Sequence, residues 1–234
     1  MSNVQGMARE ESFTRQVAEA ARSMQGLTTT QEILDEAVVV AIEIIEGCDL
    51  AGMSIRHRTG IDTPAGSGEA LRRLDELQFE LKEGPSFDAL RKHEIVLSRN
   101  LATDERFPTW GPRAAEEIGV ASIVSFRLFT EKDTLGAMNL YSRTEDAFDT
   151  EDVYNGEALA AHVAVALAEA QNVTNLETAI TVRTAIGRAE GILMERFDLS
   201  PTQAFAALRR VSQDRNVKLN RVAEELVRTR ETPS

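Results

Sequence analysis

The stretch from residue 121 to residue 141, ASIVSFRLFTEKDTLGAMNLY, decides the fold class. Two runs rich in apolar residues, Ala121–Phe129 and Thr134–Tyr141, flank the polar turn at residues 131–133. Short strand-forming runs joined by a polar turn are typical of a β-hairpin. The sequence therefore predicts two antiparallel strands here. Because helices are expected before and after these strands along the chain, the sequence indicates an α+β protein.

Further helix and strand signals precede this hairpin. Apolar residues recur at helical spacing over 12–26 and again over 29–47, where Thr29 and Glu32 have the capping-box spacing. Shorter signals predict, in order, a strand over Leu50–Arg58, a helix over Glu69–Leu81, a short helix begun by Glu83–Ser86, a strand over Ile95–Leu97, a loop bracketed by Pro108 and Pro112, and a helix over Arg113–Ile118. The order is that of an antiparallel sheet with helices packed on it.

The chain after the hairpin is predicted to be helical. One long helix extends from Glu151 to Phe197, and its apolar stripe is longer than a single domain needs. We expect a coiled coil and a parallel homodimer, the alternative being a helix folded back on its own domain. Ser200 caps the next helix, whose buried face is predicted to hold Phe205, Leu208 and Val211. A last helix over Lys218–Arg228 completes a three-helix bundle, to which the long helix contributes Ile186, Ala189, Leu193 and Phe197.

Length and charge both divide the chain in two. Its 234 residues exceed one typical domain, and we expect a larger unit over 1–171 and a smaller one over 172–234. Residues from Arg183 onward have ten Lys and Arg against seven Asp and Glu, a balance of +3, so the total of -12 leaves -15 for the rest. The acidic part discourages indiscriminate binding to polyanions, whereas the basic tail allows a local contact with nucleic acid. From charge alone, an ordinary basic side of a helical bundle explains the tail equally well.

The composition argues against secretion, membrane insertion and thiol or metal chemistry. No apolar stretch approaches the roughly 20 residues that span a bilayer, and no signal-peptide pattern is present, so we expect a cytoplasmic protein with no membrane partner. The single cysteine, Cys48, lies in an apolar stretch and is expected to be a buried structural thiol. His57, His93 and His162 do not have metal-ligand spacing, so we assign no metal and no cofactor.

Three motifs in the first part of the chain resemble a known family. They are EGPSFDAL at Glu83–Leu90, NLATD at Asn100–Asp104 followed by RFP at Arg106–Pro108, and LGAMNLYS at Leu135–Ser142. In this order they closely resemble the GAF domains of bacterial regulators, over roughly Thr28–Gln171. The resemblance implies a six-stranded sensor module that binds small molecules or dimerises. Related sequences often have cysteine after Glu-Gly-Pro, where this chain has Ser86, so neither a thiol switch nor a thioether-linked chromophore is supported there.

A second resemblance covers Thr178 to about Thr229. It rests on AIGRAEGILMERF at Ala185–Phe197, AF at 204–205, LRRVS at Leu208–Ser212, and KL at 218–219 with VA at 222–223. These motifs look like an ANTAR domain, and the two resemblances together suggest an actinobacterial-type GAF–ANTAR regulator. An ANTAR domain implies a dimeric RNA-binding module that binds paired stem-loops in nascent transcripts. The predicted function is therefore regulation by RNA binding, such as transcription antitermination, under a GAF sensor.

Basic side chains of the tail are the candidate RNA contacts. Guanidinium groups bind phosphates bidentately and stack on splayed bases, which suits hairpin loops. We expect contacts from Arg188, Arg209, Arg210, Lys218 and Arg221, with Arg183 as an outer contact; for each arginine the alternative is a solvated surface role. Ala189 and Gly191 either let a backbone approach closely or serve helix packing. Many relatives have lysine where this chain has Glu190, an acid that would repel a phosphate unless it faces away.

Two other classes of function stay open. A DNA-binding helix-turn-helix regulator also has a basic trihelical end, which could enter a major groove. A GAF-fold enzyme such as a methionine sulfoxide reductase needs catalytic thiols, and one cysteine outside the loop at Glu83–Ser86 argues against it. We therefore predict no enzymatic activity and no catalytic residues.

Overall fold

A computed structural model describes residues 2–57, 60–92, 95–131 and 133–229. Arg58, His93 and Lys132, which belong to the elements and candidate ligands considered above, lie outside these ranges. The chain divides into two compact units, residues 1–171 and 172–234, and each is described by itself. Over the described ranges, no helix combines the length and the apolar character that a membrane span requires.

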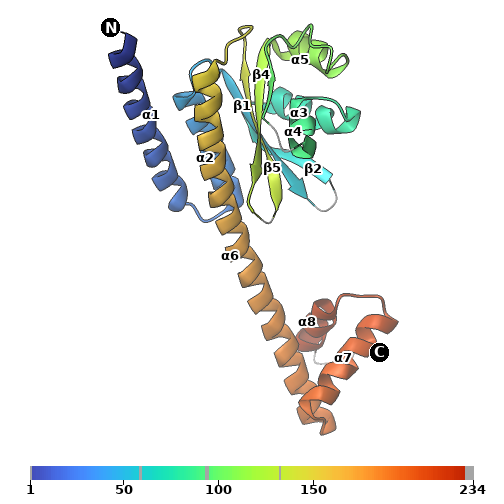
Figure 1. Cartoon of the computed structure of the whole chain (residues 1–234). Helices are drawn as coiled ribbons and strands as arrows, with labels where there is room; N and C mark the ends of the chain where they lie inside the picture. The colour runs from blue at the N-terminus through green and yellow to red at the C-terminus, as the bar shows by residue number, and fades with distance from the viewer. Residues whose placement is uncertain (1, 58–59, 93–94, 132, 230–234) are drawn as a thin grey trace. The chain divides into compact units, whose positions relative to one another are not determined.

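The first unit is built on an antiparallel sheet of five strands (Figure 1). In chain order these are β1 (Leu50–His57), β2 (Gly60–Gly66), β3 (Val96–Ser98), β4 (Ser122–Phe129) and β5 (Thr134–Ser142), arranged as β2-β1-β5-β4-β3. β4 and β5 form the predicted hairpin, and β5 also pairs with β1, with Met53 opposite Met138. The described residues thus form five strands where the resemblance implied six.

Helices pack on both faces of this sheet. On one face lie α2 (Thr30–Ile44) and the beginning of α6 (Thr150–Phe197), with α1 (Ser2–Gln25) packed on α2; on the other lie α3 (Glu69–Leu81), α4 (Pro85–Lys92) and α5 (Trp110–Ile118) (Figure 1). The strand period of two separates the two cores. On β5, Met138 and Leu140 join the first core, while Tyr141 joins the second.

Two local features hold the helices of the first face in place. The Thr29 hydroxyl accepts a hydrogen bond from the Glu32 amide at 3.2 Å, and the Thr29 amide donates to the Glu32 carboxylate at 3.0 Å, so α2 begins with the predicted capping box. On α6, a Cβ at Gly156 would lie 2.4 Å from the ring of Phe126 on β4. Only glycine therefore lets α6 approach the sheet this closely.

Two details differ from the sequence-based expectation. Strand β2 was not predicted, because its sequence GIDTPAG is poor in strand-forming residues. It forms at the edge of the sheet, where a register shift opposite Met53 and Ile55 accommodates Pro64. Pro112, expected in a loop, lies in the first turn of α5. Amides of a first helical turn have no intrahelical partner, so proline costs no hydrogen bond there.

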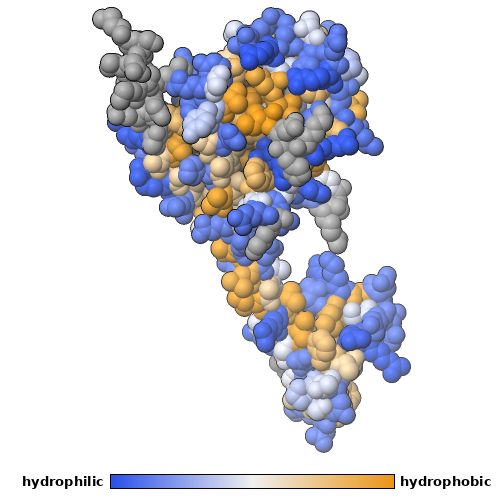
Figure 2. Space-filling model, in the orientation of Figure 1, coloured by the Kyte–Doolittle hydropathy of each residue, from blue (hydrophilic) through white to orange (hydrophobic). Residues whose placement is uncertain are grey.

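The second unit is a three-helix bundle made by the end of α6 with α7 (Pro201–Asp214) and α8 (Leu219–Thr229). Its buried core consists of Ala189, Leu193, Ala204, Leu208, Val222, Ala223 and Leu226. Ahead of this core, every residue of α6 from 172 to 181 is exposed. The exposed side chains include Val173 (50%), Leu176 (63%) and Ile180 (58%), and Figure 2 shows apolar surface along this segment.

Candidate nucleic-acid interface and sensor site

The six cations predicted to contact RNA all lie at the surface of the second unit. Arg183 and Arg188 are on α6, Arg209 and Arg210 on α7, Lys218 directly before α8, and Arg221 in its first turn; all six are exposed. They are exposed because small and aliphatic residues occupy the inward positions of the three helices. Each helix of the bundle therefore carries, or directly follows, at least one exposed cation.

Most of these cations are free to bind a ligand. Within the described part of the chain, Arg183, Arg188, Arg209 and Lys218 have no acidic partner, while Arg210 lies 3.6 Å from Asp214 and Arg221 lies 3.5 Å from Glu224. Ion pairs this exposed contribute about 1 kcal/mol at most, so a phosphate can displace them. Arg215, which was not predicted as a site residue, lies 2.9 Å from Glu225 and joins the end of α7 to α8.

The orientation of α7 corrects one prediction. The helix begins as expected with reciprocal bonds between Ser200 and Gln203, at 2.9 and 3.4 Å. Its inward face, however, holds Ala204 and Leu208, and Phe205 is 39% exposed. The inward spacing of Ala204, Leu208 and Val211 leaves Phe205 on the outer side, one turn before Arg209. Phe197, also predicted to lie in the bundle core, is 49% exposed at the end of α6.

The motif segment of α6 separates packing residues from open surface. Ala189 is fully buried in the bundle core and therefore serves packing. Gly191 is exposed, and a Cβ placed on it would meet no atom within 4 Å. Glu190 is half-buried and lies two residues after Arg188, which places it about 200° around the helix. This acid therefore faces away from the surface that holds Arg188.

A second candidate site lies inside the first unit, on the sheet face covered by α3 and α4. Asn139 on β5 is its centre. The Asn139 amide nitrogen donates to Ser54 Oγ (3.3 Å) and Asp75 Oδ1 (3.0 Å), and its oxygen accepts hydrogen bonds from Ser86 Oγ (2.6 Å) and Ser125 Oγ (2.9 Å). All five side chains are fully buried. We call these five, together with Gln78 and Tyr141, the Asn139 cluster.

Asp75 supplies the carboxyl group of the Asn139 cluster. Its Oδ1 accepts hydrogen bonds from Gln78, Asn139 and the Tyr141 hydroxyl, whereas its Oδ2 has no partner among the described residues. Burial raises the pKa of Asp75 to about 7, although these hydrogen bonds oppose the shift. Oδ2 lies over Gly52, where a Cβ would come within 2.2 Å of it. Carboxyl groups that titrate near neutral pH often mark functional sites.

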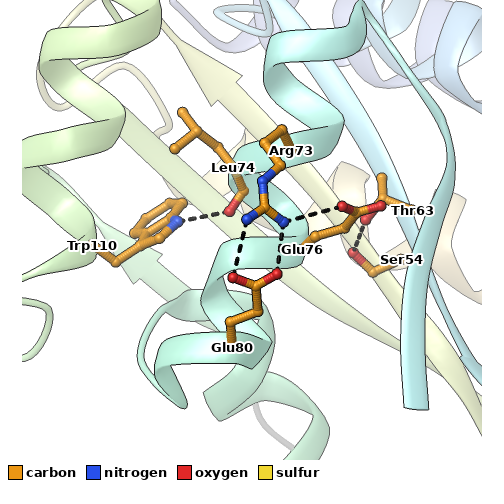
Figure 3. A network of polar contacts seen from close by, with 7 residues as sticks. All are labelled: Ser54, Thr63, Arg73, Leu74, Glu76, Glu80 and Trp110. Atoms are coloured by element: carbon orange, nitrogen blue, oxygen red, sulfur yellow. Dashed lines mark hydrogen bonds and ion pairs between the residues drawn. The ribbon is translucent and has the colours of Figure 1, made fainter. Parts of the chain in front are cut away.

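Polar contacts lie on two sides of α3 next to Asp75. On the exposed side, the Arg73 guanidinium contacts both carboxylate oxygens of Glu80, at 2.6 and 3.1 Å (Figure 3). On the buried side, Trp110 Nε1 donates a 2.8 Å hydrogen bond to the Leu74 carbonyl and so ties α5 to α3. Because Leu74 precedes Asp75 directly, this bond fixes the backbone from which the carboxyl group extends.

Comparison with known proteins follows the same division of the chain. A family model of the GAF domain matches residues 28–168, more than half of the chain. The chain belongs to the GAF domain family. A family model of the ANTAR domain matches residues 174–227, so this is a GAF–ANTAR protein. A search of curated proteins found no match.

Solved structures share the fold of the GAF domain at low sequence identity. The GAF domain of a phosphoenolpyruvate-protein phosphotransferase from Coxiella burnetii has a TM-score of 0.59 at 14% identity, covering 70% of this chain and 96% of that one. The free methionine-R-sulfoxide reductase of Neisseria meningitidis, in complex with its substrate, has a TM-score of 0.56 at 14% identity, covering 69% and 91%. At these identities the likeness concerns the fold alone.

The GAF domain has its cysteine and described histidines outside the Asn139 cluster. Cys48 is buried, donates a weak hydrogen bond to the Leu50 carbonyl at 3.4 Å, and has its pKa raised to about 12 by burial. His57 lies 2.6 Å from Asp62 at the surface, and His162 is exposed on α6. Over the described ranges, no group of three or more histidine, cysteine or acidic side chains is placed to hold a metal ion.

Replacing Asp75 with asparagine should change how the stability of the GAF domain depends on pH. In the folded protein the pKa of Asp75 is about 7, against a usual value of 3.8. Between these values the folded state keeps a proton that the unfolded state releases, so the unfolding free energy falls as pH rises. Relative to Asp75→Asn, the wild type should lose up to roughly 4 kcal/mol between pH 4 and pH 8. Denaturant titrations followed by fluorescence of Trp110, the single tryptophan, would measure this.

The control for this prediction is Asp133→Asn, which changes an exposed aspartate of the same domain. The fall of the unfolding free energy between pH 4 and pH 8 should persist in this variant, because Asp75 is unchanged. If Asp75→Asn runs parallel to the wild type, Asp75 does not titrate in this window.

Proposed function

We propose that this GAF–ANTAR protein binds paired RNA stem-loops through its ANTAR domain and thereby regulates gene expression, by transcription antitermination or a related mechanism. The observation that carries the proposal is the ANTAR match over residues 174–227, the same unit that exposes the six cations. Four of these have no acidic partner in the described structure, so they can neutralise phosphates without first breaking an ion pair. In this role the protein acts in the cytoplasm, on transcripts.

The GAF domain supplies the regulatory input in this proposal, with residues 1–171 as the sensor and residues 172–234 as the RNA reader. Within the Asn139 cluster, Asp75 Oδ2 is the buried acceptor that has no partner among the described residues, so it is the atom that a small polar ligand would contact. Fully buried polar side chains add little to a hydrophobic core and cost free energy when they are not hydrogen-bonded. Their concentration on one face of the sheet supports a binding role for this face.

We infer that the GAF domain works as a sensor and not as a thiol enzyme. Thiol catalysis and redox switching require an accessible thiolate. The one cysteine of the chain is buried, and its pKa of about 12 keeps it protonated at neutral pH. At the position where related GAF domains often have cysteine, the Ser86 hydroxyl donates a hydrogen bond to Asn139 Oδ1 and so belongs to the cluster.

A homodimer through α6 completes the proposal. Val173, Leu176 and Ile180 are exposed and follow one another at intervals of three and four residues, the spacing of a coiled-coil seam. β-Branched residues at the first and third of these positions, with leucine between them, favour a parallel coiled coil of two helices. Such a dimer presents two ANTAR bundles to an RNA with two stem-loops, one for each bundle.

A competition experiment tests the proposed function against its nearest alternative. Full-length protein is bound to a labelled RNA with two stem-loops, and unlabelled RNA stem-loops or duplex DNA are added as competitors. The RNA should compete at concentrations at least about tenfold below those of the DNA, because the cations suit splayed loops better than a regular duplex. Stronger competition by duplex DNA would instead support a helix-turn-helix regulator.

A further inference from the structure

The outer side of α7 has an unusual distribution of side-chain size. Ala204 faces the core of the ANTAR bundle and is fully buried, while the much larger Phe205 beside it is 39% exposed. Ordinary amphipathic patterning would place the larger apolar residue inward. Where a sequence departs from this pattern with no gain in packing, a functional constraint is the usual cause.

The surroundings of Phe205 favour a nucleic-acid ligand over a protein. Arg209 follows Phe205 by one helical turn on the same side, is exposed, and has no acidic partner in the described structure. The only acidic residue of α7 is Asp214 at its last position, more than two turns after Phe205, so no carboxylate of this helix lies next to the ring. A protein interface would need a contiguous apolar patch. Here the exposed neighbours of the ring one turn away along the helix are Pro201, Thr202 and Arg209, of which only Pro201 is apolar.

We propose that Phe205 and Arg209 form a stacking platform for one unpaired base of an RNA stem-loop. The ring of Phe205 lies against the face of the base, while the guanidinium of Arg209 binds the adjoining phosphate or covers the edge of the base. Double-stranded stems cannot offer such a base, because theirs are stacked within the helix. The platform therefore contacts a base in the loop of the RNA and not in its stem. This inference rests on the proposed RNA binding and names the part of the RNA that the site recognises.

The test uses full-length protein and a pool of RNAs with two fixed stems and randomised loops. The RNAs that the wild type retains are sequenced, and the dissociation constant of the best one is measured with Phe205→Ala and Phe205→Tyr. We expect Phe205→Ala to weaken binding about 5- to 150-fold, the range found for loss of one stacked base. Phe205→Tyr keeps the ring and should stay within about threefold of the wild type. Phe129→Ala, which truncates an exposed phenylalanine of the GAF domain, is the matched control and should bind normally.

A second arm locates the base itself. Each loop nucleotide of the best RNA is replaced by an abasic site, and binding is compared between wild type and Phe205→Ala. One abasic position should weaken the wild type strongly and leave Phe205→Ala unaffected, because the two changes remove the same contact. Equal effects of every abasic site on both proteins, or full affinity in Phe205→Ala, would overturn the platform and leave RNA binding in place. Failure of the wild type to retain any RNA from the pool would remove the proposed function as well.

Discussion

Changing both Arg209 and Arg210 to glutamate should weaken binding to an RNA stem-loop by several kcal/mol while leaving the fold intact. The double change removes two attractions and adds two repulsions within reach of the phosphates. Both side chains are exposed, and the one ion pair that is lost, between Arg210 and Asp214 at 3.6 Å, joins side chains that are 84% and 69% exposed. Glutamate at 210 places like charges one turn apart, which costs only a few tenths of a kcal/mol.

Circular dichroism would confirm the fold of this variant, and titrations at several salt concentrations would then measure affinity. The milder Arg→Gln changes should lower the salt slope by roughly 0.7 to 0.9 for each lost phosphate contact. The control is the pair Arg15→Glu and Arg22→Glu, which alters the net charge equally but lies on α1 of the first unit, outside the ANTAR domain. Unaltered stem-loop affinity in the folded Arg209→Glu, Arg210→Glu protein would show that the RNA surface lies elsewhere or that RNA is not the ligand.

Changing Leu176 and Ile180 to aspartate should convert the dimer into monomers, with the mass measured by analytical ultracentrifugation falling by half. The two side chains are 63% and 58% exposed in the single chain, so the monomer loses little packing. In a coiled coil, however, each aspartate would face the partner helix and bury an unpaired charge. A monomer holds one stem-loop at a time, so its affinity for an RNA with two stem-loops should fall toward that for one.

The matched control places the same charges on another side of the same helix segment. Thr178 and Thr181 lie off the Leu176–Ile180 seam and are exposed, so Thr178→Asp with Thr181→Asp should remain dimeric. If the Leu176→Asp, Ile180→Asp protein stays a full dimer, α6 is not the main interface. If the control also dissociates, added charge and not the position of the seam controls assembly.

Signals that act within a few residues predicted most of the fold. The capping boxes at Thr29 and Ser200, the hairpin of β4 and β5, and the long α6 all appear in the structure. Each depends on local hydrogen bonding or on a regular apolar period, which a sequence displays directly. Local signals did not predict strand β2, because GIDTPAG forms a strand only by pairing with the edge of β1.

The candidate sites needed three-dimensional information. Exposure of the six cations follows from helical spacing, but the outward position of Phe205 depends on which side of α7 meets the bundle core. The Asn139 cluster gave a weak signal, since Asp75 and Gln78 lie three residues apart among the buried leucines of α3, and Asn139 interrupts an apolar strand. The convergence of Gln78, Asn139 and Tyr141 on Asp75 Oδ1 depends on how α3 packs on the sheet.

Because Cys48 is buried, the native protein has no reactive thiol that would compete with a cysteine introduced for labelling. Cys48 is the only thiol in the chain, it lies in the core of the GAF domain, and burial raises its pKa to about 12. The thiolate is the nucleophile that attacks maleimides and disulfide reagents, so the native protein should react with them very slowly. A cysteine introduced at any exposed position, such as Glu177 next to the α6 seam, would then be the only site to take a spin label or form a cross-link.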